Sequence, residues 1–297
     1  MSDTTPHTRA RAEGTLPRRR GAAWQPFSGG GISRFAEARA GRTIAFLTGF
    51  ALTTALVLGW ALHTAWWPVL DRAILEFPEQ GVALRGGRLT WPESGARLLA
   101  DSPHLGVAVQ PGDHEALGRT ADLQLELLPG SLRLAGIAGF VELPWPTNAQ
   151  VPLGRVEARA GWEAWRRPVL GAVIASATAA MLVVWSLWTL ILAPVVRVVA
   201  LLSRRRITLG GCWRLGAAAC MGASPVLALG LAGYVMRWIP WPALAAVVAA
   251  HLLIAGLQLC WGLANRPRSD SKAPSDNPFQ PGAKASAPRG SRDNPFG

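Results

Sequence analysis

The run Asp113-His114-Glu115, with His104 nearby, is the densest group of side chains that could do acid–base or metal chemistry. Carboxylates and imidazoles together can bind a metal ion or transfer protons. Adjacent residues on a strand point to opposite faces, however, and the preceding Pro111-Gly112 is typical of a turn. We therefore interpret the run as a solvated loop rather than a metal site, and the sequence predicts no cofactor.

A second group consists of polar side chains inside long apolar segments. His251 and Gln258 are seven residues apart, so they share one face of a helix, and Ser224 precedes Pro225 in another apolar segment. Polar groups inside a membrane are costly and often functional, and a proline frees a carbonyl group in its helix. One interpretation is a polar path in a small transporter or channel component. The alternative, which we favour, is hydrogen bonding that holds a helix bundle together.

Sequence signatures of known catalytic sites are absent. The chain has no nucleophile elbow, no glycine-rich phosphate loop, no HExxH motif and no Ser-His-acid arrangement. The sequence therefore predicts a non-enzymatic protein without catalytic residues.

A short motif recurs near the C-terminal end. Asp276-Asn277-Pro278-Phe279 is repeated as Asp293-Asn294-Pro295-Phe296 in a segment rich in Ser, Pro, Gly and Ala. An exposed phenylalanine after an Asn-Pro turn could dock into a groove on a partner protein, and the alternative is drift of a low-complexity sequence. The composition of both ends predicts disordered tails at 1–42 and 264–297.

Four apolar windows are the elements that must position these residues. The windows are 43–70, 168–196, 215–236 and 239–263. Each is long enough to cross about 30 Å of hydrocarbon as a helix, because a helix rises about 1.5 Å per residue. Small residues at Gly171, Ala175 and Ala179, and at Ala218 and Gly222, predict close helix packing.

Arginine counts predict the side of the membrane on which each connection lies. Residues 1–42 hold eight Arg and three acidic residues, and 197–214 hold five Arg and no acidic residue. Basic segments stay in the cytoplasm, so we predict an inner-membrane protein with both tails and the basic 197–214 loop in the cytoplasm. The net charge of +12 follows from this topology, and we predict no nucleic-acid partner.

The remaining segment, 71–167, would be an extracytoplasmic domain. Its apolar residues alternate, as in Leu123, Leu125 and Leu127, and Gly86-Gly87 between two alternating runs indicates a β-hairpin. We predict five to seven strands in a small antiparallel sheet or sandwich, then an interfacial helix at 156–165. The predicted fold class is membrane α+β: a four-transmembrane-helix bundle with an antiparallel β-rich domain.

This layout resembles a family of uncharacterised bacterial four-span membrane proteins, a domain-of-unknown-function family whose membrane half is loosely Yip-like. The likeness rests on Phe77-Pro78, on the run Gly86-Gly87-Arg88-Leu89-Thr90-Trp91-Pro92 and on Ala223-Ser224-Pro225. The resemblance implies no activity. From the layout we expect an envelope protein whose β-rich domain binds a protein, glycan or ligand, while the helices anchor it in the bilayer or relay a signal, with a homo-oligomer as a further option.

Overall fold

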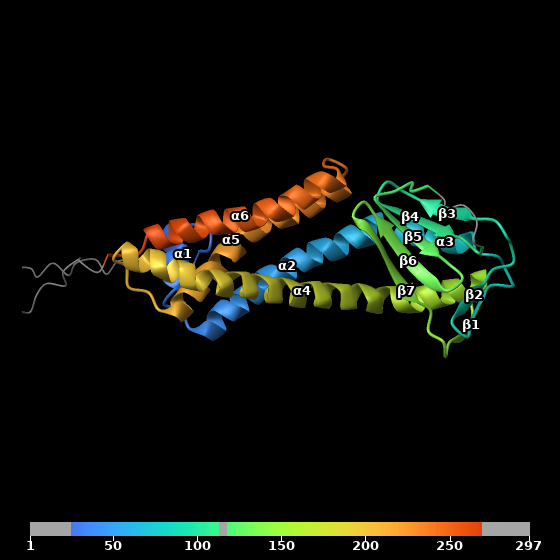
Figure 1. The fold of residues 1–297 in the computed structure, drawn as a ribbon, viewed down its shortest axis with the longest axis horizontal. Coiled ribbons are helices and arrows are strands. Elements are labelled where there is room, and N and C mark those ends of the chain that lie inside the picture. The colour runs from blue at the N-terminus through green and yellow to red at the C-terminus, as the bar shows by residue number, and fades with distance from the viewer. Residues whose placement is uncertain (1–24, 113–117, 269–297) are drawn as a thin grey trace, which may run out of the picture.

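The computed structural model describes residues 25–112 and 118–268, which form a helical bundle at one end and a β domain at the other (Figure 1). The helices are α1 (Gly29–Phe35), α2 (Ala40–Ala65), α3 (Trp67–Leu75), α4 (Arg155–Leu202), α5 (Leu209–Val235) and α6 (Trp241–Ala264). Helix α4 belongs to both ends, because it starts beside the β domain and runs the length of the bundle.

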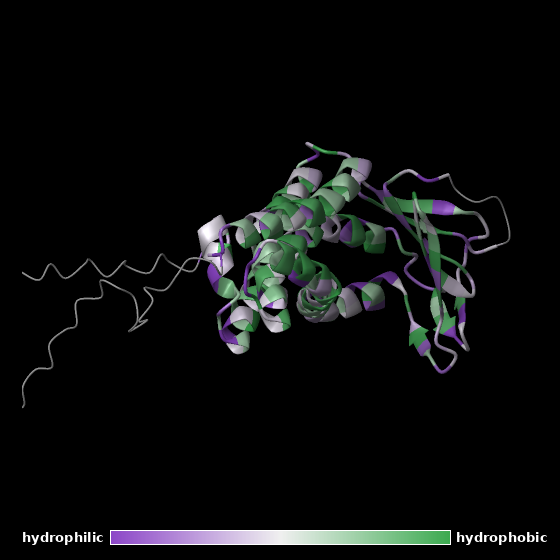
Figure 2. Ribbon diagram, turned by 60° about the vertical axis from the view of Figure 1, so that its left-hand side comes forward, coloured by the Kyte–Doolittle hydropathy of each residue, from purple (hydrophilic) through white to green (hydrophobic). Residues whose placement is uncertain are grey.

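Four helical stretches are long and apolar enough to cross a membrane. They are Ala40–Leu75, Arg155–Leu202, Leu209–Val235 and Trp241–Ala264. Figure 2 shows hydrophobic residues along these helices, whereas the β domain mixes hydrophobic and hydrophilic ones. The four apolar helices and the two sheets described below confirm the predicted α+β class in a form compatible with a membrane. The arrangement is not a simple four-helix bundle, because α1 and α3 add further helices and α5 lies among the others.

Helix α5 contacts α1, α2, α4 and α6, and most of its first half is buried. Small side chains permit this central position: a Cβ added at Gly216 would lie 2.8 Å from the Thr189 side chain of α4. Ala218 and Gly222 are buried here as predicted. The predicted packing role of Gly171, Ala175 and Ala179 is wrong, because all three are exposed on α4.

Helix α1 corrects part of the prediction that residues 1–42 are disordered. Ser28 caps its start by accepting a hydrogen bond from the Gly31 amide (3.1 Å). Ile32 and Phe35 are fully buried against α5 and α6. This stretch is rich in glycine, but two apolar residues one helical turn apart are enough to bury one face. Residues 1–24 and 269–297, with the repeated Asn-Pro-Phe motifs, lie outside the described residues.

The β domain contains eight described strands in two sheets. The strands are β1 (Ala83–Arg85), β2 (Arg88–Thr90), β3 (Arg97–Asp101), β4 (Leu105–Val109), β5 (Leu123–Leu127), β6 (Ser131–Gly136), β7 (Gly139–Pro144) and β8 (Gln150–Pro152). Their orders are β2-β1-β8 and β3-β4-β5-β6-β7. The predicted hairpin is confirmed: β1 and β2 pair across Gly86 and Gly87, which take positive φ angles of 54° and 75°.

The prediction of a purely antiparallel domain is wrong, because β4 and β5 pair in parallel. Apolar alternation is the same in parallel and antiparallel strands, so the sequence pattern could not distinguish them. The predicted interfacial helix at 156–165 is not a separate element either. It forms the first turns of α4, which has 48 residues in all and runs on through Pro168 and Pro194.

We predict that Gly216→Leu destabilises the bundle, because the new side chain would overlap Thr189 and overpacking costs about 1–3 kcal/mol. The melting temperature of the purified protein in detergent should fall. Gly171→Leu is the matched control, since a Cβ at Gly171 meets nothing within 4 Å. Equal melting temperatures for the two variants would show that α5 is not closely packed.

Candidate functional site

Of the reactive and polar residues singled out in the sequence, the structure describes His104, Ser224, His251 and Gln258. Asp113, His114 and Glu115 lie outside the described residues. His104 is buried at 7% exposure, and its ring lies 4.6 Å from that of Tyr234, at the end of α5. The Tyr234 hydroxyl donates to Asp122 (2.8 Å), which is also 4.0 Å from His104 Nδ1. These residues tie the β domain to the α5–α6 hairpin.

His251 has a partner that the sequence did not predict. Its Nε2 accepts a hydrogen bond from the Trp185 indole of α4 (3.0 Å), and both side chains are 2% exposed. A buried bond between two spans satisfies two polar groups that lipid could not. This geometry favours the packing interpretation of His251 over the polar path.

Ser224 also has a local partner. Its hydroxyl donates to the Met221 carbonyl (2.9 Å). In a regular helix that carbonyl would accept from residue 225, but Pro225 has no N–H, so Ser224 replaces the missing donor. Gln258 faces Gly222, and its Oε1 is buried without a hydrogen-bond partner among the described residues. Hydrogen bonds between described residues do not join Ser224, His251 and Gln258 into one network.

A wide apolar face of the five-stranded sheet is the most distinctive feature of the β domain. In the register of the sheet, Leu127, Leu132 and Leu143 lie side by side, as do Leu125, Leu134 and Val141. Helix α3 covers the β3 and β4 side of this face. Val141 and Leu143 on β7 remain 61% and 58% exposed. The apolar face is therefore wider than the helix that covers it.

A hollow of about 550 Å³ lies between this sheet face and the first turns of α4. Its walls are almost entirely apolar. They include Leu125, Leu127, Leu132, Trp91, Trp145, Trp162 and Trp165, with Glu157 as the single charged side chain. The indole N–H of Trp145 is already bonded to the Leu128 carbonyl (2.9 Å). The volume lies within the usual range for small-molecule sites, about 300–1,000 Å³.

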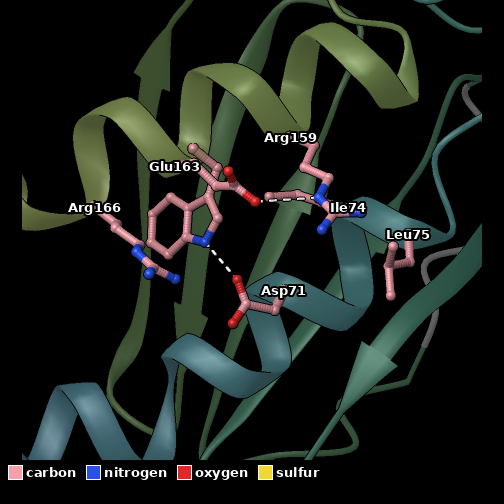
Figure 3. A pocket seen from close by; sticks show the side chains of 7 residues that line it. Asp71, Ile74, Leu75, Arg159, Glu163 and Arg166 are labelled. Atoms are coloured by element: carbon pink, nitrogen blue, oxygen red, sulfur yellow. Dashed lines mark hydrogen bonds and ion pairs between the residues drawn. The ribbon is translucent and has the colours of Figure 1, made fainter.

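A second, charged hollow of about 310 Å³ lies between α3 and α4 and shares Ile74 and Trp162 with the first. Figure 3 shows Asp71 on α3 opposite Arg159, Glu163 and Arg166 on α4. The Trp162 indole donates to Asp71 (2.6 Å), and Arg159 pairs with Glu163 (3.2 Å). Trp162 therefore separates an apolar space from a charged one.

The arrangement is suited to binding an apolar or amphipathic molecule. Within the described residues, no three His, Cys, Asp or Glu side chains gather as metal ligands. Sequence reasoning missed the hollow because its walls come from strands, α3 and α4, which are distant in the chain. The only signal was the apolar alternation of the strands combined with the tryptophans before the second span. No family model, curated protein or solved structure matches the chain.

We predict that Trp185 and His251 are energetically coupled, since the Trp185 N–H and the His251 Nε2 are paired with each other inside the bundle. A double-mutant cycle of Trp185→Phe and His251→Ala should give a coupling energy of about 0.6–1.7 kcal/mol. Unfolding of the purified protein in mixed micelles measures it. A coupling of zero, with altered ion flux in proteoliposomes and unchanged stability, would instead favour the polar path.

Proposed function

We propose that this chain is a non-enzymatic protein of the bacterial inner membrane whose extracytoplasmic β domain binds a molecule with an acyl chain. The apolar hollow between the sheet and α4 carries the proposal. An alkyl chain would gain about 25 cal/mol for each Å² of apolar surface that it buries there. The charged hollow beyond Trp162 offers both signs of charge for the polar end of such a ligand.

The composition of the hollow favours an acyl chain over a glycan. A sugar needs several hydrogen-bond donors and acceptors around it, because unpaired polar groups are costly to bury. Glu157 is the only charged wall residue and the Trp145 donor is already used, so the Trp91 indole N–H is the one buried wall donor without a partner among the described residues. A protein partner is the alternative for the exposed strip on β7, where Val141 and Leu143 are uncovered.

The arginine distribution supports the orientation in this proposal. The connection between α4 and α5 carries Arg204, Arg205 and Arg206 without an acidic residue, which is typical of the cytoplasmic side. The β domain lies at the opposite end of α4 and would therefore face outward. An acyl-chain ligand could reach it from the outer leaflet, because the hollow is bounded by the part of α4 that directly precedes the span.

We expect Gly161→Phe to block ligand binding, because Gly161 lines the hollow and a Cβ there meets nothing within 4 Å. A fatty acid carrying a diazirine group would be photocrosslinked to the protein in nanodiscs, and labelled peptides would be identified by mass spectrometry. Labelling of the peptides around Leu125–Leu132 and Trp145 should be strong in the natural sequence and lost in Gly161→Phe.

The matched control is Gly171→Phe, ten residues further along the same helix, where the space around a Cβ is also open. It should keep the labelling, because Gly171 does not line the hollow. Labelling confined to the spans in the natural sequence, or equal labelling in both variants, would contradict an acyl-chain site in the β domain.

The orientation of the protein in the membrane can be tested by labelling introduced cysteines. Ser94 and Ser203 are exposed at opposite ends of the molecule. In a background without Cys212, Cys220 and Cys260, a membrane-impermeant thiol reagent should label Ser94→Cys in intact cells and Ser203→Cys only after lysis. The reverse pattern would place the β domain in the cytoplasm and overturn the proposed route to the hollow.

A further inference from the structure

The end of the bundle away from the β domain contains a basic hollow of about 490 Å³. Arg206, Arg214 and Arg266 line it, together with a single carboxylate, Glu37. These residues come from the α4–α5 connection, the start of α5 and the segments after α6 and α1. Four separate parts of the chain therefore meet around an excess of positive charge.

Two of these arginines are held in place by backbone carbonyls. Arg214 donates twice to the Ala36 carbonyl (2.8 and 3.2 Å), and Arg266 donates to the Ser33 carbonyl (3.1 Å). Carbonyls at helix ends fix a guanidinium group without neutralising its charge. Glu37 bonds to Arg266 (3.0 Å) and is the single carboxylate at the hollow, so it offsets one of the three positive charges. The hollow keeps a net positive charge.

Hydrogen-bond donors remain unused around the hollow. Arg266 is nine-tenths buried; its Nε has no acceptor among the described residues but is shielded from solvent, and its Nη2 also donates to the Arg206 carbonyl (3.3 Å). The Arg206 side chain is exposed and has no ion pair or hydrogen bond to any described residue. The hollow also faces the start of α5, where Thr208 caps the Gly211 amide (3.0 Å) and the positive end of the helix dipole lies.

We propose that this hollow binds a phosphate group, either that of an anionic phospholipid or that of a soluble phosphate. Planar guanidinium groups pair with phosphate oxygens through two parallel hydrogen bonds, and the Arg206 side chain can offer both, while Arg214 and Arg266 add positive charge beside it. Arg206 closes on the phosphate, while Arg214 and Arg266 form the fixed wall. The site lies at the other end of the molecule from the apolar hollow and does not depend on its function.

The test compares Arg206→Gln with Arg197→Gln in the purified full-length protein. Arg206 makes no described side-chain contact, so its loss should leave the fold intact. Arg197 is exposed on α4 near the same end but does not line the hollow, so its variant removes the same charge. Melting temperature in mixed micelles would be followed while phosphatidylglycerol, phosphatidylcholine or inorganic phosphate is added, at constant ionic strength.

We expect phosphatidylglycerol to stabilise the natural protein and Arg197→Gln at similar concentrations, and to require about tenfold more lipid for Arg206→Gln. The same dependence on Arg206 with inorganic phosphate, but not with lipid, would assign the site to a soluble phosphate. Equal weakening in both variants would indicate general surface attraction and overturn the proposal, as would no stabilisation by either anion.

Discussion

The close approach of four helices to α5 is the constraint on which the helical half depends. Without a hydrophobic driving force in lipid, packing distance decides whether spans hold together. Glycines on α5 bring the Thr189 side chain of α4 and Val247 of α6 against its backbone. The bulky side chains of α2, α4 and α6 are consequently left on their outer faces, where Leu56, Leu187 and Leu253 are exposed. The membrane-facing surface of the bundle thus follows from the small residues at its centre.

Hydropathy was enough to predict the four long apolar helices, because a lipid-spanning stretch is a local property of the chain. It could not predict α1, whose burial depends on a groove between α5 and α6 that exists only after those helices pack. The parallel pairing of β4 and β5 was likewise hidden, since the direction of a strand relative to its neighbour leaves no trace in its apolar alternation. Strand positions were predictable from alternation, and the β1–β2 pair from its Gly-Gly turn, but the partners of the other strands were not.

For the polar residues too, contacts within one segment could be predicted from the sequence, whereas contacts between distant segments could not. The spacing of His251 and Gln258 indicated a shared helix face, but Trp185 lies 66 positions from its partner His251. Ser224 was noticed because it precedes Pro225, and its actual role, replacing the donor that proline lacks, is local and could have been predicted. The apolar hollow has walls from distant strands and helices, so no single segment contained its signal.

The uninterrupted helix α4 has a mechanical consequence. Its 48 residues span about 72 Å at about 1.5 Å per residue. Its first turns form one wall of the apolar hollow, and Leu201 near its last turn lines the basic hollow. A rigid rod of this length that tilts by about one degree about one end moves its other end by about 1 Å. One continuous helix therefore joins the walls of the two hollows.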